Sequence, residues 1–448
     1  MKGTLSLPPR RRTLPRLLSP RGLGCQCAFL SLLLAGCLAP PPEPPAPTPE
    51  AAPAEVLKTI VLRASFPKVP TVGQRRRFTN PEETGLIDRL GDYLDEVSRG
   101  QLKLEATVSN KIYHLPNPRK SYYNKPVRML RDALDLAVRP APEGEKALIE
   151  GLEPDLIILF FAGPAAETDM ALKFRGKLPW SGAVSVLNYK LPDGHRIAQG
   201  VLVGEKPLSK LQPFGVLCHE VGHILGWPEL YAPNKSHEGI GVWGLMGQGT
   251  WLGMGTAPPH PSAYSKLMSG WVDARVIESS EHVELPAVQT SGEVIKIFAR
   301  GPEYPREYFL IENRQKIGFD RSLRGDGLLI WHIDEQQRSF RRSQDIPTRK
   351  RVDLLTADSW PSHLDIGHRN GGNRGDAGDP WSDRAEGPGP QTQPHTGSYD
   401  GTPGRFAIRN ISPSGPVMSF DIEFLTEPTP AARPQGDPTS VSASEDDT

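Results

Sequence analysis

The chain has 448 residues, which is long enough for two or three domains with sizeable hydrophobic cores. Lysine plus arginine and aspartate plus glutamate each total 52, so the formal net charge is zero and gives no electrostatic basis for binding nucleic acid. The 44 glycines and 47 prolines favour a loop-rich protein over a helical bundle.

Residues 1–36 have the features of an export signal. Basic side chains precede a short apolar run at residues 28–35, which is too short to cross a bilayer in the mature protein. The run ends in Leu34-Ala-Gly-Cys37, which is similar to the processing site of bacterial lipoproteins; this resemblance implies that Cys37 is lipidated and begins the mature chain. The alternative is an ordinary secretory signal that contains a cysteine, and the arginines before Leu14 also permit twin-arginine export.

Cysteine usage agrees with this interpretation. Cys25 and Cys27 would leave with the signal, and Cys37 would carry the lipid. Only Cys218 then remains, so the mature chain forms no internal disulfide, and we interpret Cys218 as a small buried hydrophobe rather than a regulatory thiol. We expect a lipid-anchored, extracytoplasmic protein of the bacterial cell envelope. Leu38 replaces the aspartate that usually retains lipoproteins at the inner membrane, which favours the outer membrane or cell surface.

Residues 37–55 form a proline-rich stalk. Such a tract favours an extended polyproline helix of about 3.1 Å per residue, which gives a semi-rigid spacer of roughly 55 Å. We expect it to hold the following domain clear of the membrane.

Residues 56–275 are predicted to form an α+β catalytic domain, because apolar runs of strand length alternate with amphipathic segments. The predicted strands are residues 59–63, 102–108, 155–161 and 183–188, and the predicted helices are residues 80–98 and 125–138. The strand at 183–188 is either an internal strand or an edge strand that pairs with extended substrate.

Residues 219–229 read His-Glu-Val-Gly-His-Ile-Leu-Gly-Trp-Pro-Glu and carry the most specific signal in the chain. On a helix of 3.6 residues per turn, His219 and His223 project from one face and can bind a single zinc ion. Glu220 lies beside them, where it can take a proton from an attacking water. The apolar residues of this helix fall on its opposite face. The alternative is a pair of exposed histidines on an amphipathic helix.

A third metal ligand is expected after Gly226, where the chain can fold back. Glu229 is our candidate, because it follows His219 by ten residues, the position at which glycine-turned zincin motifs place a ligand. His237 and Glu238 are the alternatives.

A glycine-rich turn, Trp243-Gly-Leu-Met-Gly-Gln-Gly-Thr-Trp251, follows with Met246 at its centre. Together with His-Glu-x-Gly-His-x-Leu-Gly-x-Pro and Pro261-Ser-Ala-Tyr-Ser-Lys266, this turn resembles the immune inhibitor A family of secreted bacterial metallopeptidases. Further similarities lie at residues 93–100, 327–334 and 374–381.

This resemblance covers most of residues 56–425. It implies a zincin-like, metzincin-type catalytic domain with Zn²⁺ as cofactor, a methionine turn at Met246 beneath the metal, and protein or peptide substrates. The chain departs from the family pattern at Glu229 and Ala232, where aspartates are usual.

Residues 276–425 are predicted to form an all-β, sandwich-like C-terminal domain, because short apolar strands alternate with Gly/Pro turns. Residues 363–403 form a long Gly/Asp-rich connection, which is unusual in a compact domain unless it has a function. Oxygen ligands at three-residue spacing predict a Ca²⁺ site there, with a solvated loop as the alternative. The candidate ligands are Asn370, Asn373, Asp376 and Asp379. Residues 426–448 have the composition of a disordered tail.

The predicted function is that of a zinc metalloendopeptidase. Glu220 would accept the proton of the attacking water and deliver it to the leaving amine, and Tyr231, Tyr264 or His260 would donate a hydrogen bond to the oxyanion. The alternatives are a non-catalytic binding lipoprotein on a decayed peptidase fold and a zinc hydrolase of non-peptide substrates. We expect a monomer that meets protein substrates and, through its anchor, a membrane.

Overall fold

The computed structural model describes a large part of the chain beyond the predicted signal and stalk. The described residues are 54–67, 80–139, 149, 151–168, 176–184, 187–205, 210–337, 344–358, 361–367 and 370–425. They all belong to one compact unit. The predicted lipid site Cys37 and the tail 426–448 lie outside them. Each helix in the described part of the chain is too short or too polar to cross a membrane.

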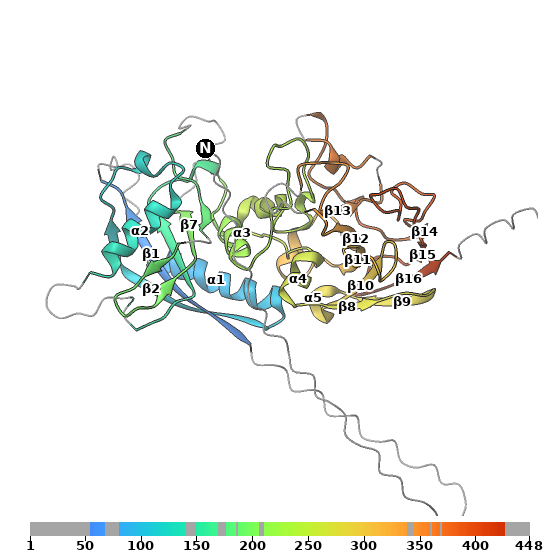
Figure 1. Cartoon of the computed structure of the whole chain (residues 1–448), viewed down its shortest axis with the longest axis horizontal. Coiled ribbons are helices and arrows are strands. Elements are labelled where there is room, and N and C mark those ends of the chain that lie inside the picture. Colours follow the sequence, from blue (N-terminus) through green and yellow to red (C-terminus); the bar gives the residue numbers. More distant parts are fainter. Residues whose placement is uncertain are drawn as a thin grey trace, which may run out of the picture. The chain divides into compact units, whose positions relative to one another are not determined.

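The first sheet contains five strands in the order β2-β1-β3-β7-β4 (Figure 1). They are β1 (Glu55–Ser65), β2 (Leu102–His114), β3 (Leu156–Phe161), β4 (Gly182–Val184) and β7 (Gly200–Gly204). The first four in that order are parallel, and β4 pairs with β7 as an antiparallel edge strand. Parallel strands are buried on both faces, which explains the continuous apolar sequence of β3. A separate two-stranded sheet is formed by β5 (Tyr189–Lys190) and β6 (Arg196–Ile197).

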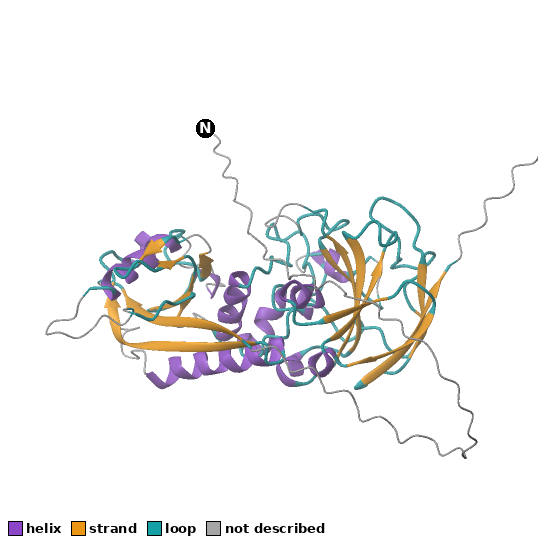
Figure 2. Cartoon of the chain, turned by 60° about the horizontal axis from the view of Figure 1, so that its bottom comes forward, coloured by secondary structure: helices purple, strands orange, loops and turns teal. Residues whose placement is uncertain are grey.

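Helices cover both faces of this sheet. On one face, α1 (Asn80–Ser98) and α3 (Phe214–Ile224) share a hydrophobic cluster with Ile158 of β3. On the other face, α2 (Pro126–Ala137) shares a second cluster with the next residue of the strand, Leu159. Successive strand residues point to opposite faces, so β3 contributes to both cores. Figure 2 shows α1 running along the sheet.

Most of the elements predicted in this half of the chain are confirmed. The runs at residues 59–63 and 155–161 lie in β1 and β3, and residues 102–108 lie in β2, which is longer than predicted. Of the strand predicted at residues 183–188, the first two residues lie in β4, residues 185–186 lie outside the described part of the chain, and residues 187–188 are not in a strand. The sequence analysis missed β7, because five residues bounded by glycines carry no periodic pattern that separates a strand from a loop.

Two further sheets form the second half of the chain (Figure 1). One has the order β13-β12-β11-β10-β8 and the other β14-β15-β16-β9. Their bounds are β8 (Asp273–Val276), β9 (Glu281–Pro286), β10 (Glu293–Phe298), β11 (Glu307–Arg314), β12 (Gly327–Asp334), β13 (Val352–Leu355), β14 (Arg384–Glu386), β15 (Phe406–Ile411) and β16 (Val417–Phe424). A third hydrophobic cluster contains residues of both sheets, such as Phe309 and Phe420.

Two short helices connect these parts of the chain. Helix α4 (Ala263–Ser269) begins after Ser262, whose side chain accepts a hydrogen bond from the Ser265 backbone N–H, and ends at the left-handed Gly270. Helix α5 (Val288–Ser291) follows β9. The segment 363–403, predicted as a connection, contains β14; this strand is defined only by its pairing with the distant β15.

The structure confirms a mixed α and β fold with several sheets and few helices. The metzincin type of the catalytic domain, the sandwich type of the C-terminal domain and the domain boundary near residue 275 stay predictions.

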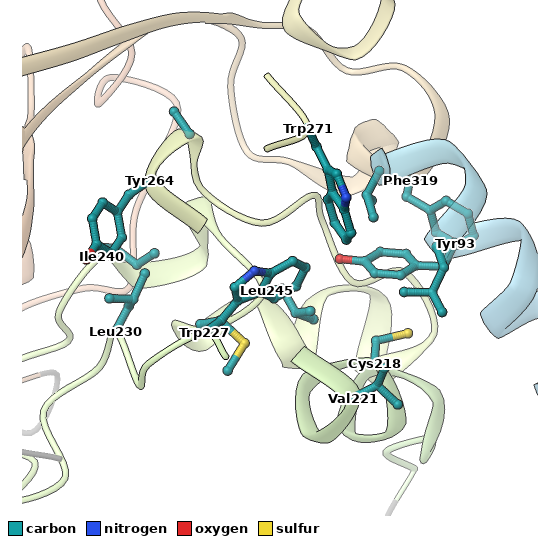
Figure 3. Close-up of a cluster of buried hydrophobic side chains, with 14 of the residues drawn as sticks. Tyr93, Cys218, Val221, Trp227, Leu230, Ile240, Leu245, Tyr264, Trp271 and Phe319 are labelled. Atoms are coloured by element: carbon teal, nitrogen blue, oxygen red, sulfur yellow. The ribbon is translucent and has the colours of Figure 1, made fainter. Parts of the chain in front are cut away.

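An aromatic cluster surrounds α3 and joins it to both halves of the chain (Figure 3). The ring of Trp227 packs edge-on against Trp271, with centroids 5.4 Å apart. Tyr93 of α1 lies edge-on to Phe319, with centroids 5.0 Å apart. Aromatic pairs of this geometry contribute about 0.5–1.5 kcal/mol each beyond their buried area. The helix with His219 and His223 therefore packs against a buried aromatic cluster.

A buried charge network lies next to this cluster. Arg314 is fully buried and donates to Asp320, with its Nη2 2.6 Å from Oδ1, and to Glu312, with its Nη1 3.1 Å from Oε1. The backbone N–H of His260 also donates to Asp320, over 2.9 Å. Although burial alone would raise the pKa of Asp320, the charges of Arg314 and His260 hold it well below its usual range. The network fixes the segment that leads into α4.

Candidate functional site

Helix α3 places the two histidines of the motif side by side. Its apolar side chains, including Leu217 and Val221, pack into the aromatic cluster, so the opposite face carries His219 and His223. The two imidazole rings lie edge-on with their centroids 4.8 Å apart. The spacing of four residues thus brings both rings to one face, as the sequence predicts.

Gly226 turns the chain back toward these rings. Its φ of 93° lies in the left-handed region that favours glycine. The turn brings Glu229 to the histidines: its Oε1 lies 3.2 Å from His223 Nε2, and its Oε2 lies 3.4 Å from His219 Nε2. One ligand atom from each of the three residues lies within 4.8 Å of the other two.

The alternative third ligands lie elsewhere. The carboxylate of Glu238 pairs with Arg374, whose Nε lies 3.2 Å from its Oε2. The Nδ1 of His237 accepts a hydrogen bond from the Gly239 backbone N–H over 3.1 Å. Of the three candidates, the structure brings Glu229 to the histidine pair.

Hydrogen bonds fix the orientation of both imidazoles. The Nδ1 of His223 lies 3.0 Å from the Trp227 carbonyl oxygen, and the Nδ1 of His219 lies 3.2 Å from the Leu245 carbonyl oxygen. The hydroxyl of Thr250 lies 3.0 Å from the same Nδ1 and itself donates to the Leu245 carbonyl oxygen over 2.9 Å. Each Nδ1 therefore carries a proton, and each Nε2 faces Glu229, where it can share a second proton with the carboxylate or, once that proton is lost, offer a lone pair to a cation.

These atoms fit a catalytic zinc site. Two neutral imidazole nitrogens and one carboxylate oxygen form a donor set that catalytic zinc uses, with a fourth position left for substrate or water. The Oε2 atom of Glu229 is buried and has no hydrogen-bond partner, so a cation would satisfy an oxygen that the described residues leave unbonded.

The charges of the cluster agree with cation binding. Burial alone would raise the pKa of Glu229, but the neighbouring His219 and His223 lower it well below its usual range, so the carboxylate is ionised. Burial would lower the pKa of His219, but Glu229 raises it to about 9. The ionised carboxylate of Glu229 is therefore stabilised by positive charge on or between the two imidazoles. Either a proton on a histidine or a bound divalent cation supplies this charge.

Glu220 lies between the histidine pair and the edge strand β4. Burial raises the pKa of its carboxyl group, and the charges of His219 and His223 partly oppose this effect. The backbone N–H of Ala183 in β4 donates a hydrogen bond to it. A carboxylate with a raised pKa is suited to accept a proton near neutral pH.

The predicted methionine turn lies directly beneath α3. Met246 is fully buried, and a Cβ atom added to Gly222 would lie only 2.7 Å from its Sδ. The turn also supplies the Leu245 carbonyl oxygen that contacts His219. The close approach of Met246 to α3 therefore requires a glycine one residue before His223.

Of the three predicted oxyanion donors, Tyr231 lies in the cluster. Its hydroxyl donates to Glu229 Oε1 over 3.0 Å, and its ring stacks on His219 with centroids 6.3 Å apart. Tyr264 instead accepts a hydrogen bond from Arg351 over 3.2 Å, and His260 lies 2.8 Å from Glu96. Both are nearly fully buried.

The sequence analysis missed Glu167 and Thr250. Glu167 lies in a short 3₁₀ helix (Ala166–Thr168), where its Oε2 accepts a hydrogen bond from the Ser181 backbone N–H over 3.2 Å. Burial raises its pKa, and the nearby charge of Glu220 raises it further. No motif surrounds Glu167, so only the tertiary structure could have revealed it. Thr250 stands inside the glycine-rich turn, which was the one available signal.

A second group of potential metal ligands lies in the Gly/Asp-rich segment. It contains Asp358, His363 and Asp376, whose ligand atoms lie within 4.8 Å of one another. Of the four predicted calcium ligands, only Asp376 belongs to this group. The Oδ1 of Asn373 is bonded to the Gly375 backbone N–H over 2.7 Å, and the described contacts do not bring Asn370 to the group.

Asp379, the fourth predicted ligand, is buried beside this group. Its Oδ2 accepts hydrogen bonds from Trp243 Nε1 over 2.7 Å and from the Asp376 backbone N–H over 3.0 Å, whereas its Oδ1 has no hydrogen-bond partner among the residues that the structure describes. Burial raises its pKa to about 6, and the charges of Asp358 and Asp376 contribute to the rise.

Residues 209–277 match the model of the family described as immune inhibitor A peptidase M6, catalytic domain. The matched segment contains α3, Glu229, the methionine turn and α4. The match supports a metallopeptidase that acts on proteins or peptides. A search of curated proteins found no match.

We predict that Thr250→Val weakens zinc binding about 10- to 100-fold, because the hydroxyl that helps to orient His219 is lost while the shape of the side chain is kept. Zinc affinity would be measured by competition with a chromogenic chelator. Thr256→Val is the matched control, since the Thr256 hydroxyl donates to the Gly253 carbonyl oxygen and does not contact a histidine of the site among the described contacts. Equal zinc affinity in both variants would show that Thr250 does not orient the ligand.

Proposed function

We propose that this protein is a zinc endopeptidase that hydrolyses peptide bonds in protein substrates as a monomer. The observation that carries the proposal is the convergence of His219, His223 and Glu229 beside Glu220 of the same helix. The match to a metallopeptidase family over this segment supports it.

Bound zinc would be held by His219, His223 and Glu229, and would supply the Lewis acidity that polarises the scissile carbonyl and favours deprotonation of water. Glu220 is the general base: it takes the proton of the attacking water and delivers it to the leaving amine. The hydroxyl of Tyr231, next to Glu229, donates a hydrogen bond to the developing oxyanion.

Substrate pairs with the edge strand β4. Among the described residues, its position at the end of the sheet leaves one side without a neighbouring strand, and Ala183 of this strand contacts Glu220. An extended peptide added to such an edge gains main-chain hydrogen bonds whatever its sequence. The same pairing would hold the scissile bond near the general base.

Two other functions remain as alternatives. A binding lipoprotein on a decayed peptidase fold has no use for a general base, and the presence of Glu220 next to His219 favours an enzyme. A zinc hydrolase of non-peptide substrates would share the metal site but would not cleave proteins.

We expect the full chain to cleave an unfolded protein mixture, and a chelator to abolish the cleavage. Glu220→Ala removes the general base, so activity falls at least about 100-fold while zinc stays bound. Glu278→Ala, at an exposed position, is the control and keeps full activity. Absence of cleavage by the zinc-loaded wild type would sink the peptidase proposal and leave the binding protein or the non-peptide hydrolase, which a substrate panel would separate.

We also propose that the mature protein is anchored outside the cytoplasm by lipid on Cys37, at the outer membrane or cell surface. The support is the sequence Leu34-Ala-Gly-Cys37 after a basic and apolar leader, and the proline-rich tract that follows it.

Cells that express the wild type should incorporate radiolabelled fatty acid into the protein and retain it in the membrane fraction. Cys37→Ser should lose both the label and membrane retention, because the acceptor thiol is absent. Cys27→Ser, inside the signal, should lose neither. Membrane retention of Cys37→Ser would contradict the lipid anchor, and sedimentation with the inner membrane would contradict the proposed location.

We further propose a calcium site in the Gly/Asp-rich segment. The supporting observation is the buried Oδ1 of Asp379, which has no hydrogen-bond partner in the described part of the chain and lies beside Asp358 and Asp376. Calcium is typically bound by several carboxylate oxygens, such as those of these three aspartates.

Calcium should therefore raise the thermal unfolding temperature of the full chain. A ligand present at 100 times its dissociation constant stabilises the folded state by about 2.7 kcal/mol. Asp379→Asn should abolish this shift, because the Asp379 carboxylate loses its charge, whereas the exposed Asp383→Asn should keep it. An unchanged shift in Asp379→Asn, or no shift in the wild type, would rule the site out.

A further inference from the structure

A cavity of about 290 Å³ opens beside the beginning of β4. Its lining residues are Tyr122, Asn124, Pro126, Met129, Trp180 and Ser181. Trp180 is 49% exposed, which is unusual for so large an apolar side chain, and it immediately precedes Ser181 and β4. The cavity thus adjoins the strand that we propose pairs with substrate.

The floor of the cavity is rigid. Met129 belongs to α2 and is fully buried in the cluster that packs on this face of the sheet. Tyr122 is also fully buried, and its hydroxyl donates to Asp132 Oδ2 over 2.6 Å. The exposed indole of Trp180 therefore stands at the mouth of a preformed apolar hollow.

Backbone hydrogen bonds place this hollow next to the path of a paired peptide. The N–H groups of Ser181 and Ala183 donate to the carboxylates of Glu167 and Glu220. Ser181 and Ala183 are two positions apart along an extended chain, so both N–H groups point to the same edge, the one that does not face β7. Carbonyl oxygens of a paired peptide would accept from the same edge, and the one opposite Ser181 would displace Glu167.

Alternate side chains of a peptide paired with this edge would point toward the cavity. Val184 belongs to the cluster around α2, and Trp180 has the same parity along the strand. An extended peptide on this edge also presents alternate side chains to opposite faces of the sheet. Those on the α2 face meet Trp180 and Met129, while the scissile bond lies by Glu220 on the α3 face.

We propose that this cavity is a substrate subsite that takes an apolar side chain of the peptide, and that Trp180 determines its selectivity. The inference rests on the proposed peptidase function. The volume is below the usual range of about 300–1,000 Å³ for small-molecule pockets and suits a single side chain. Trp180 lies three residues before Ala183, or about 10 Å along a strand, so the selected residue stands a few positions from the cleaved bond.

The test compares the full chain with Trp180→Ala and Tyr304→Ala in digests of an unfolded protein mixture. Tyr304 is a matched control, an aromatic residue 47% exposed on the connection between β10 and β11. Wild type and Tyr304→Ala should select apolar residues at one fixed position near the cleaved bond. Trp180→Ala should lose about tenfold or more in kcat/KM for peptides with leucine or phenylalanine there, but not for the same peptides with glycine.

A binding measurement separates this proposal from the peptidase function. The Glu220→Ala form, alone and combined with Trp180→Ala or Tyr304→Ala, is titrated with a fluorescent library of extended peptides that carry leucine, phenylalanine or glycine at each position in turn. An apolar preference that only Trp180→Ala removes supports the subsite even if the wild type cleaves nothing. Cleavage or binding without a Trp180-dependent apolar preference overturns the subsite and leaves the peptidase proposal intact.

Discussion

The close packing of α3 on the methionine turn is the constraint on which the site depends. A Cβ atom at Gly222 would lie 2.7 Å from Met246 Sδ and 2.7 Å from the ring of Trp227, so only glycine permits this approach. The approach brings the Leu245 carbonyl oxygen to His219 and the Trp227 carbonyl oxygen to His223. The same packing of α3 on the methionine turn therefore also orients the two imidazoles. Loss of this packing would remove the hydrogen bonds that hold both rings.

Charge balance adds a second constraint on the same cluster. Glu229 is largely buried, so its ionised carboxylate needs a compensating positive charge at the two neighbouring imidazoles. Glu220 shares this environment but also contacts the Ala183 backbone of β4. The proposed chemistry on α3 and the proposed substrate-binding edge of the sheet are thus joined through one carboxylate.

The Gly/Asp-rich segment packs against the glycine-rich turn that carries Met246. Trp243, which opens the glycine-rich turn, donates to Asp379, and the Val242 backbone N–H donates to the Arg374 carbonyl oxygen over 2.8 Å. These contacts join residues more than 130 positions apart in sequence to the turn that carries Met246. The length of the segment, which appeared excessive for a connection, is explained by this support.

The sequence by itself determined what local periodicity and spacing can carry: the helix with His219 and His223, the turn at Gly226 and the buried strand β3. The proposed zinc and glutamate chemistry also rests on residue type and spacing. Only the tertiary structure chose Glu229 over His237 and Glu238, placed Tyr231 rather than Tyr264 or His260 in the cluster, and brought in Glu167 and Thr250. These depend on contacts between distant segments, for which a single sequence holds no periodic signal.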